Sequence, residues 1–286
     1  MLHLLLLTWA QTQVVLLGTG TPNADPLRSG PSTAIVVNGS SYVVDLGPGV
    51  VRRASAAAEK GIKALAPANL KTAFLTHLHS DHTAGLPDFY LMPAVLDRHA
   101  PLKLIGPKGT RSMARHIQAA YKEDIDNRVH KLEKGDPASY RIDVTEIKPG
   151  VVFKDANVTV TAIAVEHAGW PHSFAFHFQT PDKRIVVSGD TVYNEAIATL
   201  CNGCDILVHE VYSELGLTRR PPQWQAYHRN AHTSGPDVGK IAALAKPKLL
   251  VLTHLLLWGV PESQLTKEIQ STYTGPFVIG KDLEVY

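Results

Sequence analysis

The sequence has few cysteines, no apolar run long enough to span a membrane, and no excess of charge of one sign. Its two cysteines, Cys201 and Cys204, form a single C-x-x-C pair, which is too few for a four-cysteine zinc site. A redox motif stays open, but we expect structural thiols, with a tight disulfide as the alternative if the protein is exported. The 28 basic and 26 acidic residues leave a net charge of +2, so no strong field attracts nucleic acid or an acidic membrane.

The chain also lacks low-complexity segments and any change of composition that would mark a linker. With 286 residues and 44% apolar content it can bury a large core, and we interpret residues 13–286 as one globular domain. Residues 1–12 differ, because a leucine-rich start with a small residue before the polar Gln11 resembles the remnant of a secretory signal. A first strand or a misassigned start codon is the alternative. A signal predicts a periplasmic or secreted protein, and its absence a cytoplasmic one.

Histidine is abundant, with 14 residues in the chain. Three of them and one aspartate form the run H-x-H-x-D-H directly after the apolar residues 73–75, and these are His77, His79, Asp81 and His82. Imidazole nitrogens and a carboxylate form a ligand mixture that zinc, iron or manganese accepts. Side chains alternate along extended backbone, so His77 and His79 point the same way. The next two donors come from the following turn and can reach a second ion. A solvated histidine-rich turn is the alternative.

Further donors follow apolar runs later in the chain. His167, Asp190 and His254 each stand where a hydrophobic stretch ends at a polar turn. Taken singly, such a histidine is usually a surface or core residue, and an aspartate after glycine usually serves a turn. Together with the histidine-rich run they complete a dinuclear set. One metal would take His77, His79 and His167, the other Asp81, His82 and His254, and Asp190 would bridge them with one oxygen to each. We predict two divalent ions, Zn²⁺ first, with Mn²⁺ or Fe²⁺ as alternatives.

Strand-like and helix-like patterns interleave in both halves of the chain, which predicts an α/β protein with mixed layers. The expected strands cover residues 14–17, 34–37, 42–45, 73–76, 102–105, 158–165, 174–178, 184–187, 206–208, 249–253 and 277–279. The expected helices cover residues 50–65, 111–121, 192–200 and 236–245. The two halves would then form two sheets, with loops from each meeting over the metals.

These motifs resemble those of metallo-β-lactamase-fold hydrolases, in the branch that contains ribonuclease Z, cyclic-nucleotide phosphodiesterases and certain arylsulfatases. The resemblance runs from about residue 13 to the end. Besides the histidine-rich run, it depends on residues 17–22, 44–49, 188–191, 208–210, 231–234 and 252–254. It implies an αββα sandwich, in which two mixed sheets are flanked by helices and a dinuclear site lies at the sheet edge.

Two metals about 3.5–4 Å apart can share a water and lower its pKa, so that a metal-bridging hydroxide attacks the substrate. The resemblance adds His232 as the group that protonates the leaving oxygen, and Glu210 as the carboxylate that orients His232 and raises its pKa. A surface pair is the alternative for these two residues. With Asp81, also a metal ligand, they are the predicted catalytic residues. His209 alternates away from Glu210 and is expected to lie behind the site or in the core.

Aromatic residues gather near the candidate ligands in the sequence. We hypothesise that they line a cleft for an aryl or base-like group, and ordinary packing is the alternative. The predicted substrate-binding residues are Trp170, Tyr212, Trp224, Tyr227, His228 and Trp258.

The leading functional hypothesis is a metal-dependent phosphodiesterase that acts on a small-molecule ester, with aryl sulfates as a related substrate. A lactonase or carboxylic-ester hydrolase on the same metals is a second hypothesis, and a non-catalytic binding member of the fold is a third. A transfer RNA 3′-end endonuclease is disfavoured, because the interval between His167 and Asp190 lacks the Gly- and Lys-rich arm expected of such enzymes. Nucleic acid and membrane are therefore not expected as partners. A homodimer is common in the family, but the sequence carries no interface signal.

Overall fold

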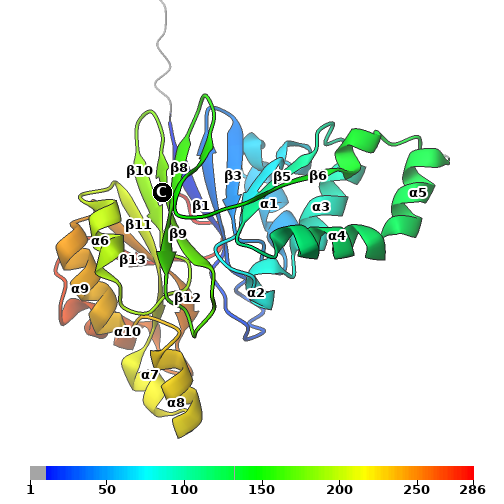
Figure 1. Cartoon of the computed structure of the whole chain (residues 1–286). Helices are drawn as coiled ribbons and strands as arrows, with labels where there is room; N and C mark the ends of the chain where they lie inside the picture. The colour runs from blue at the N-terminus through cyan, green and yellow to red at the C-terminus, as the bar shows by residue number, and fades with distance from the viewer. Residues whose placement is uncertain (1–10, 132) are drawn as a thin grey trace, which may run out of the picture.

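Two β-sheets lie face to face between helices in the computed structural model, which describes residues 11–131 and 133–286 (Figure 1). The first sheet has the order β1-β2-β3-β4-β5-β6 and the second the order β13-β12-β11-β10-β9-β8-β7. Both sheets contain parallel and antiparallel pairs. The predicted αββα sandwich with two mixed sheets is therefore confirmed.

The first sheet consists of β1 (Gln13–Gly18), β2 (Ser32–Val37), β3 (Ser40–Val44), β4 (Thr72–Phe74), β5 (Leu102–Gly106) and β6 (Ile142–Glu146). The second consists of β7 (Gly150–Lys154), β8 (Thr159–Val165), β9 (Ser173–Gln179), β10 (Arg184–Val187), β11 (Ile206–Tyr212), β12 (Leu249–Leu256) and β13 (Phe277–Ile279). The helices of the first half are α1 (Val50–Glu59), α2 (Ser80–Thr83), α3 (Leu86–Val95), α4 (Thr110–Ala120) and α5 (Lys122–His130). Those of the second half are α6 (Glu195–Cys201), α7 (Glu214–Thr218), α8 (Pro222–Arg229), α9 (Gly235–Ala245) and α10 (Glu262–Gln270).

The apolar runs of the strands are continuous because both faces of each sheet are buried. Along β1, Val14 and Leu16 face the core between the sheets, whereas Val15 and Leu17 face the core under α1 and α3. The second sheet has its own outer core, in which α6, α9 and α10 pack against it. The ends of several strands are thus fixed at one edge, where α2, α7 and α8 gather (Figure 1).

The structure shortens two of the predicted helices. The helix expected over residues 50–65 ends at Glu59 as α1, because Gly61, with a φ of 109°, turns the chain away. The helix expected over residues 192–200 begins at Glu195 as α6. Its start is set by Asn194, whose side chain accepts a hydrogen bond from the backbone N–H of Ala196.

Several elements have no counterpart among the predicted ranges. Strands β6 and β7 are half-exposed and lack a strong apolar pattern, and none of the residues of α5 or α8 is buried. Helix α3 contains Pro87 and Pro93, which argue against a helix locally, yet five of its residues are buried. Packing against the rest of the fold therefore decides α3 against its local preference.

The C-x-x-C pair forms a disulfide between Cys201 and Cys204, and both residues are buried at the end of α6. The expectation of structural thiols is wrong, and the alternative of a tight disulfide is correct. The turn between them is allowed because Asn202 and Gly203 both adopt positive φ, at 38° and 74°.

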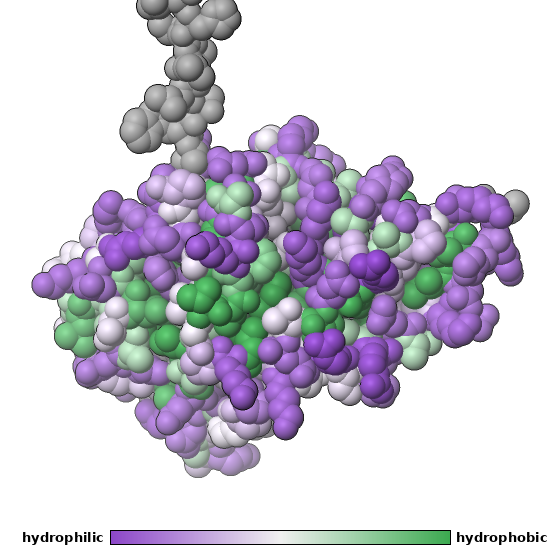
Figure 2. Space-filling model, turned by 45° about the horizontal axis from the view of Figure 1, so that its top comes forward, coloured by the Kyte–Doolittle hydropathy of each residue, from purple (hydrophilic) through white to green (hydrophobic). Residues whose placement is uncertain are grey.

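One side of the molecule carries mostly polar residues around its rim and hydrophobic residues toward its middle (Figure 2). At the open edge of the second sheet, Val151 on β7 is 66% exposed.

In the described part of the chain, the helices are too short or too polar to cross a bilayer. The homodimer stays a prediction. Of residues 1–12, the predicted signal remnant, residues 1–10 lie outside the described residues. Thr12 is buried, and its N–H donates to the carboxylate of Asp182 at 3.0 Å.

Arg98 is fully buried beneath α3 and holds four backbone carbonyls together. Its guanidinium donates to the carbonyls of Leu70, Phe89, Tyr90 and Ser139 at 2.7–3.4 Å. Burial lowers its pKa to about 10, so it stays charged at neutral pH. The side chain therefore stabilises the first half of the fold by satisfying carbonyls that have no access to water.

We expect Arg98→Leu to lower the free energy of unfolding by about 3–5 kcal/mol, because the buried carbonyls lose a charged donor. Urea denaturation followed by circular dichroism measures the loss. Arg52→Leu is the control, since the Arg52 side chain is 85% exposed, and it should change stability by no more than about 0.5 kcal/mol. Equal effects of the two substitutions would contradict a structural role for Arg98.

Candidate metal centre

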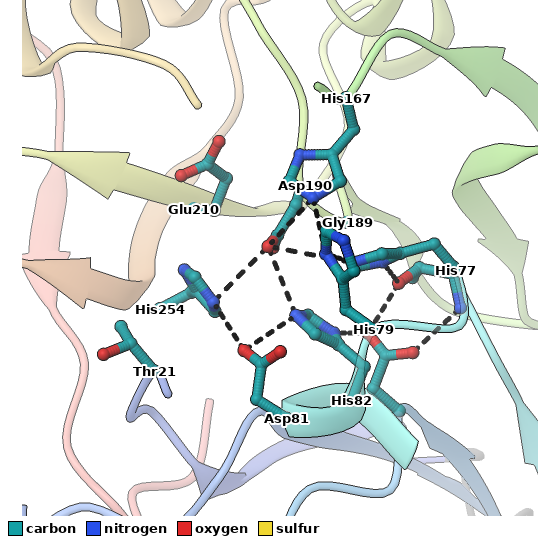
Figure 3. A network of polar contacts seen from close by, with 12 residues as sticks. Thr21, His77, His79, Asp81, His82, His167, Gly189, Asp190, Glu210 and His254 are labelled. Atoms are coloured by element: carbon teal, nitrogen blue, oxygen red, sulfur yellow. Dashed lines mark hydrogen bonds and ion pairs between the residues drawn. The ribbon is translucent and has the colours of Figure 1, made fainter. Parts of the chain in front are cut away.

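The seven predicted ligands lie in one cluster at the edge where the two sheets meet (Figure 3). His77 and His79 follow β4, and Asp81 and His82 lie on α2. His167 follows β8, Asp190 follows β10, and His254 lies within β12. Four separate segments of the chain therefore deliver donors to one place.

The first group of donors consists of His77, His79 and His167. Nδ1 of His79 lies 3.1 Å from Nε2 of His77 and 3.0 Å from Nε2 of His167. Ligands about 2.0–2.1 Å from a tetrahedral zinc are separated by roughly 3.3 Å, which is close to these spacings. Three imidazole nitrogens that converge in this way fit a shared cation.

The second group consists of Asp81, His82 and His254. Oδ2 of Asp81 lies 3.3 Å from Nε2 of His254 and 3.5 Å from Nε2 of His82. Nε2 of His82 is buried and has no hydrogen-bond partner among the described residues. A cation would satisfy this nitrogen, so the second group also fits a metal.

Asp190 lies between the two groups (Figure 3). Its Oδ2 is 3.2 Å from Nε2 of His82 and 3.4 Å from Nε2 of His254, and it is 4.0 Å from Nε2 of both His77 and His167. Oδ2 is the Asp190 oxygen in all four of these contacts. Oδ2 of Asp190 therefore faces both groups, and the bridging of two metals by one oxygen each stays a prediction.

Burial and neighbouring charges set the ionisation of the cluster. Burial opposes ionisation of Asp190, but positive charge on His254 and His82 outweighs it and holds the pKa of the carboxyl well below its ordinary value. Burial also lowers the pKa of His77, His79 and His167, which favours the neutral imidazoles that bind a metal. For His82 and His254 the charge of Asp190 outweighs burial and raises the pKa, so these two imidazoles would release a proton when a metal binds.

Two backbone features aim the donors. Gly189 has a φ of 60°, and a Cβ there would lie 2.7 Å from the carbonyl oxygen of Phe174, so only glycine allows the turn before Asp190. In β12 the register with β11 shifts between Thr253 and Leu255, which leaves His254 as an extra residue with a φ of 47°. This bulge turns the imidazole of His254 toward the cluster.

Glu210 and His232 lie next to the cluster, as predicted. Nδ1 of His232 is 3.3 Å from Oε2 of Glu210, and both residues are buried. The other oxygen of Glu210 accepts the backbone N–H groups of Thr191 and Thr233, at 3.2 and 3.0 Å. Glu210 therefore ties the loop that carries Asp190 to the loop that carries His232.

The expected rise in the pKa of His232 is wrong. Burial lowers the pKa of His232 to about 4, and it raises the pKa of Glu210 to about 8 with a further contribution from Asp190. At neutral pH the Glu210 carboxyl is therefore protonated and faces a neutral imidazole of His232. His209, expected behind the site or in the core, is fully buried, with Nδ1 2.7 Å from the carbonyl of Glu210.

Asp45 also belongs to the site, although the sequence motif gave no role to it. Its Oδ2 lies 2.8 Å from Nδ1 of His82, and its two oxygens accept the N–H and the hydroxyl of Thr76, both at 2.8 Å. The carboxylate thereby orients His82 with Nε2 toward Asp190. Asp45 follows the apolar strand β3 and lies within residues 44–49, which carry part of the family resemblance, so two sequence signals could have indicated it.

Four of the six predicted substrate-binding residues line a cavity of about 290 Å³ beside the cluster, which we call the inner cavity. They are Trp224, Tyr227, His228 and Trp258. The same cavity is lined by His79, Asp81, Asp190, His232 and His254. An aromatic ligand in this cavity would therefore lie next to the candidate metal ligands.

Trp170 and Tyr212 do not reach the inner cavity. Both line a separate hollow of about 750 Å³ that reaches His167 and His232 from another side. Tyr212 is 4% exposed and packs against Trp258, with 6.1 Å between ring centroids. Tyr212 therefore does not share the inner cavity with the other four residues, and its role in substrate binding stays a prediction. Trp170 packs against the imidazole of His79, at 4.5 Å between centroids.

Comparisons with known proteins agree with this architecture. A family model described as "Beta-lactamase superfamily domain" matches residues 41–255. A ribonuclease Z of Mycobacterium bovis is 32% identical over 277 residues, which cover 95% of this chain and 96% of that protein. Among solved structures, the metallo-β-lactamase fold protein YhfI from Bacillus subtilis has a TM-score of 0.73 at 18% identity, covering 96% of this chain and 99% of that one. The short form of human tRNase Z has a TM-score of 0.68 at 21% identity, covering 96% and 98%.

Proposed function

This chain belongs to the beta-lactamase superfamily, in the branch of its ribonuclease Z relatives, and from that premise we propose that it is a dinuclear metal-dependent phosphodiesterase. The observation that carries the proposal is the single oxygen of Asp190 that faces two groups of three donors. The first metal would be held by His77, His79 and His167, and the second by Asp81, His82 and His254. When bound, two divalent ions would activate a water and neutralise charge on the phosphoryl oxygens.

The protein side chains supply the remaining steps. His232 lines the inner cavity while its Nδ1 faces Glu210, which leaves Nε2 to donate a proton to the leaving oxygen. The Glu210 carboxyl then returns a proton to Nδ1. Asp81 lines the cavity with a side chain that is 11% exposed, where it would hold the second metal beside the substrate. The aromatic wall binds an aryl group or a base.

The direct test is hydrolysis of bis(p-nitrophenyl) phosphate and of an aryl sulfate, each with and without added Zn²⁺ or Mn²⁺. We expect metal-dependent turnover of the phosphodiester, with slower turnover of the sulfate. A panel of lactones run in parallel separates the carboxylic-ester alternative. If the metal-loaded protein hydrolyses neither ester, the proposal is wrong.

RNA cleavage is the second candidate function. It is favoured by the 32% identity to a protein named ribonuclease Z over 96% of that protein's length, and this weighs against our expectation that nucleic acid is not a substrate. The test is incubation of a precursor transfer RNA carrying a 3′ trailer with the metal-loaded protein. Release of the trailer would support an endonuclease, whereas turnover of small esters alone would support a small-molecule enzyme.

Removing the charge of Asp45 should lower the affinity for one metal and leave the affinity for the other unchanged. Asp45 has a φ of 62°, which asparagine tolerates, so Asp45→Asn changes charge without straining the backbone. We expect about a 10–100-fold loss of affinity for the metal held by His82. Chelator competition measures both affinities, with the exposed Asp143→Asn as control. An equal loss at both metals would contradict the assignment.

The shared proton of Glu210 and His232 predicts an alkaline limit to activity. The pKa of Glu210 is raised to about 8, so the pair holds its proton below that pH and loses it above. We expect kcat/KM on a diester with a poor leaving group to fall as the pH rises through about 8. The pH profile of the Glu210→Gln variant should lack this fall in kcat/KM, the alkaline limb of the profile. A limb that persists unchanged in the variant would assign it to another group.

A further inference from the structure

The inner cavity continues into a second space that contains an unpaired cation. This outer hollow, of about 440 Å³, shares Asn23, Arg220 and Trp258 with the inner cavity. Arg220 therefore lies at the junction, on the turn between α7 and α8. A ligand that extends from the candidate metals toward solvent through this opening passes its guanidinium.

Neighbouring arginines have partners within the protein, and Arg220 has none. Arg28 forms an ion pair with Glu262 at 2.6 Å, and Nη1 of Arg219 donates to the carbonyl of Gly259 at 3.0 Å. In the ranges that the structure describes, the Arg220 side chain makes no hydrogen bond or ion pair, and its Nε is buried without a partner. Asp25 also lines the outer hollow, but its carboxylate accepts the N–H of Leu27. A partly buried, unpaired guanidinium is costly unless an anion completes it.

The protein fixes Arg220 in this position before any ligand arrives. The backbone carbonyl of Arg220 accepts a hydrogen bond from the side-chain amide of Gln225 at 2.8 Å. The backbone N–H of Arg220 donates to the carbonyl of Leu217 at 2.9 Å. The preceding helix is anchored by buried Glu268, whose carboxylate accepts the hydroxyl of Ser213 at 2.9 Å and the N–H of Glu214 at 2.8 Å. A preorganised cation loses little entropy on binding.

Aromatic side chains occupy the space between Arg220 and the cluster. Trp258 lines both spaces, and its ring lies 4.6 Å from that of His228, between centroids. Trp224 lines the inner cavity as well, with 6.1 Å between its ring centroid and that of His228. A base or aryl ring that packs on these side chains would have one end at the candidate metals and the other at the guanidinium.

We propose that Arg220 binds a second phosphate of a nucleotide substrate whose scissile phosphodiester lies at the metal cluster. The inference rests on the proposed phosphodiesterase function and narrows its substrate class to nucleotides with a further anionic group. The second phosphate can belong to a small nucleotide or to the next residue of an RNA strand. In both cases the recognising chemistry is a guanidinium–phosphate pair beside an aromatic wall.

The kinetic test compares two substrates. One is the 4-nitrophenyl ester of thymidine monophosphate, and the other carries an additional phosphate on the free sugar hydroxyl. We expect the metal-loaded protein to have about a tenfold lower KM for the ester with the additional phosphate, equivalent to about 1.4 kcal/mol. Arg220→Gln should remove this preference and leave kcat within about twofold, and Arg220→Lys should keep part of it. Arg52→Gln, on the distant helix α1, should behave as the unsubstituted protein.

Calorimetry with non-reacting ligands gives an independent readout. Adenosine bisphosphate should bind the metal-loaded protein about tenfold more tightly than adenosine monophosphate, and Arg220→Gln should abolish the difference. An adenosine trinucleotide is the second arm, and tighter binding of this ligand than of the bisphosphate assigns the site to an RNA strand. Equal binding of mono- and bisphosphate, or equal losses for both in the variant, would overturn the proposal. If neither ester is hydrolysed, the proposed function fails, while the calorimetric comparison still decides the role of Arg220.

Discussion

Asp190→Asn should lower kcat/KM on a phosphodiester by about a thousandfold, because the neutral amide cannot serve two cations at once. The carboxylate oxygen of Asp190 lies within 4.0 Å of histidine nitrogens from both donor groups. No other carboxylate of the described residues has this position. The substitution should also reduce the metal content of the dialysed protein from two ions toward one, as measured by emission spectrometry.

The control for this experiment is Asp143→Asn, which removes a carboxylate from an exposed position on β6. It should keep both metals and full activity. If Asp190→Asn retains two ions and a rate near that of the unsubstituted protein, the bridging role is excluded. Melting temperatures of both variants, recorded with and without added metal, separate a loss of folding from a loss of metal.

His232→Ala should slow the hydrolysis of diesters with poor leaving groups by about a hundred- to ten-thousandfold. The reason is that a departing alkoxide needs the proton which His232 and Glu210 hold between them. The loss should be below tenfold for bis(p-nitrophenyl) phosphate, because its leaving group departs without protonation. Steady-state rates on a dinucleotide and on the nitrophenyl ester measure the two cases.

His228→Ala is the matched control, because His228 lines the same cavity but has no carboxylate partner. It should affect both substrates to a similar, modest extent. A parallel loss on both substrates in His232→Ala would show that His232 orients the substrate or a metal and does not protonate the leaving group. Such an orienting role is compatible with the structure, because Nδ1 of His232 lies 3.9 Å from Oδ2 of Asp190, a candidate metal ligand.

The sequence predicts much of the site because each donor stands at a recognisable place. The run from His77 to His82 follows an apolar strand of the first sheet, and Asp190 follows one of the second. Their proximity can be predicted because together they complete a set of ligands for two metals. His254 is a different case, because it lies inside β12 and reaches the cluster only through a bulge. No propensity of the neighbouring residues predicts that bulge.

Substrate contacts could be predicted only in part, because aromatic residues in sequence near a ligand need not face it. Trp224, Tyr227, His228 and Trp258 reach the inner cavity, whereas Tyr212 belongs to a strand that buries it. Arg220 has no sequence signal at all, since nothing in the dipeptide Arg219-Arg220 indicates which guanidinium finds a partner within the protein.

Chain order and side-chain chemistry by themselves determined which elements are doubly buried strands, where those strands stop, and which residues offer nitrogen or oxygen donors at the stops. These properties are local, because an apolar run and the type of a ligand side chain can be identified from consecutive residues. Only the tertiary structure decided that one oxygen of Asp190 faces both donor groups, that burial lowers the pKa of His232 to about 4, and that Arg220 lacks a partner. Each of these depends on distance and desolvation between segments far apart along the chain, which no stretch of sequence encodes alone.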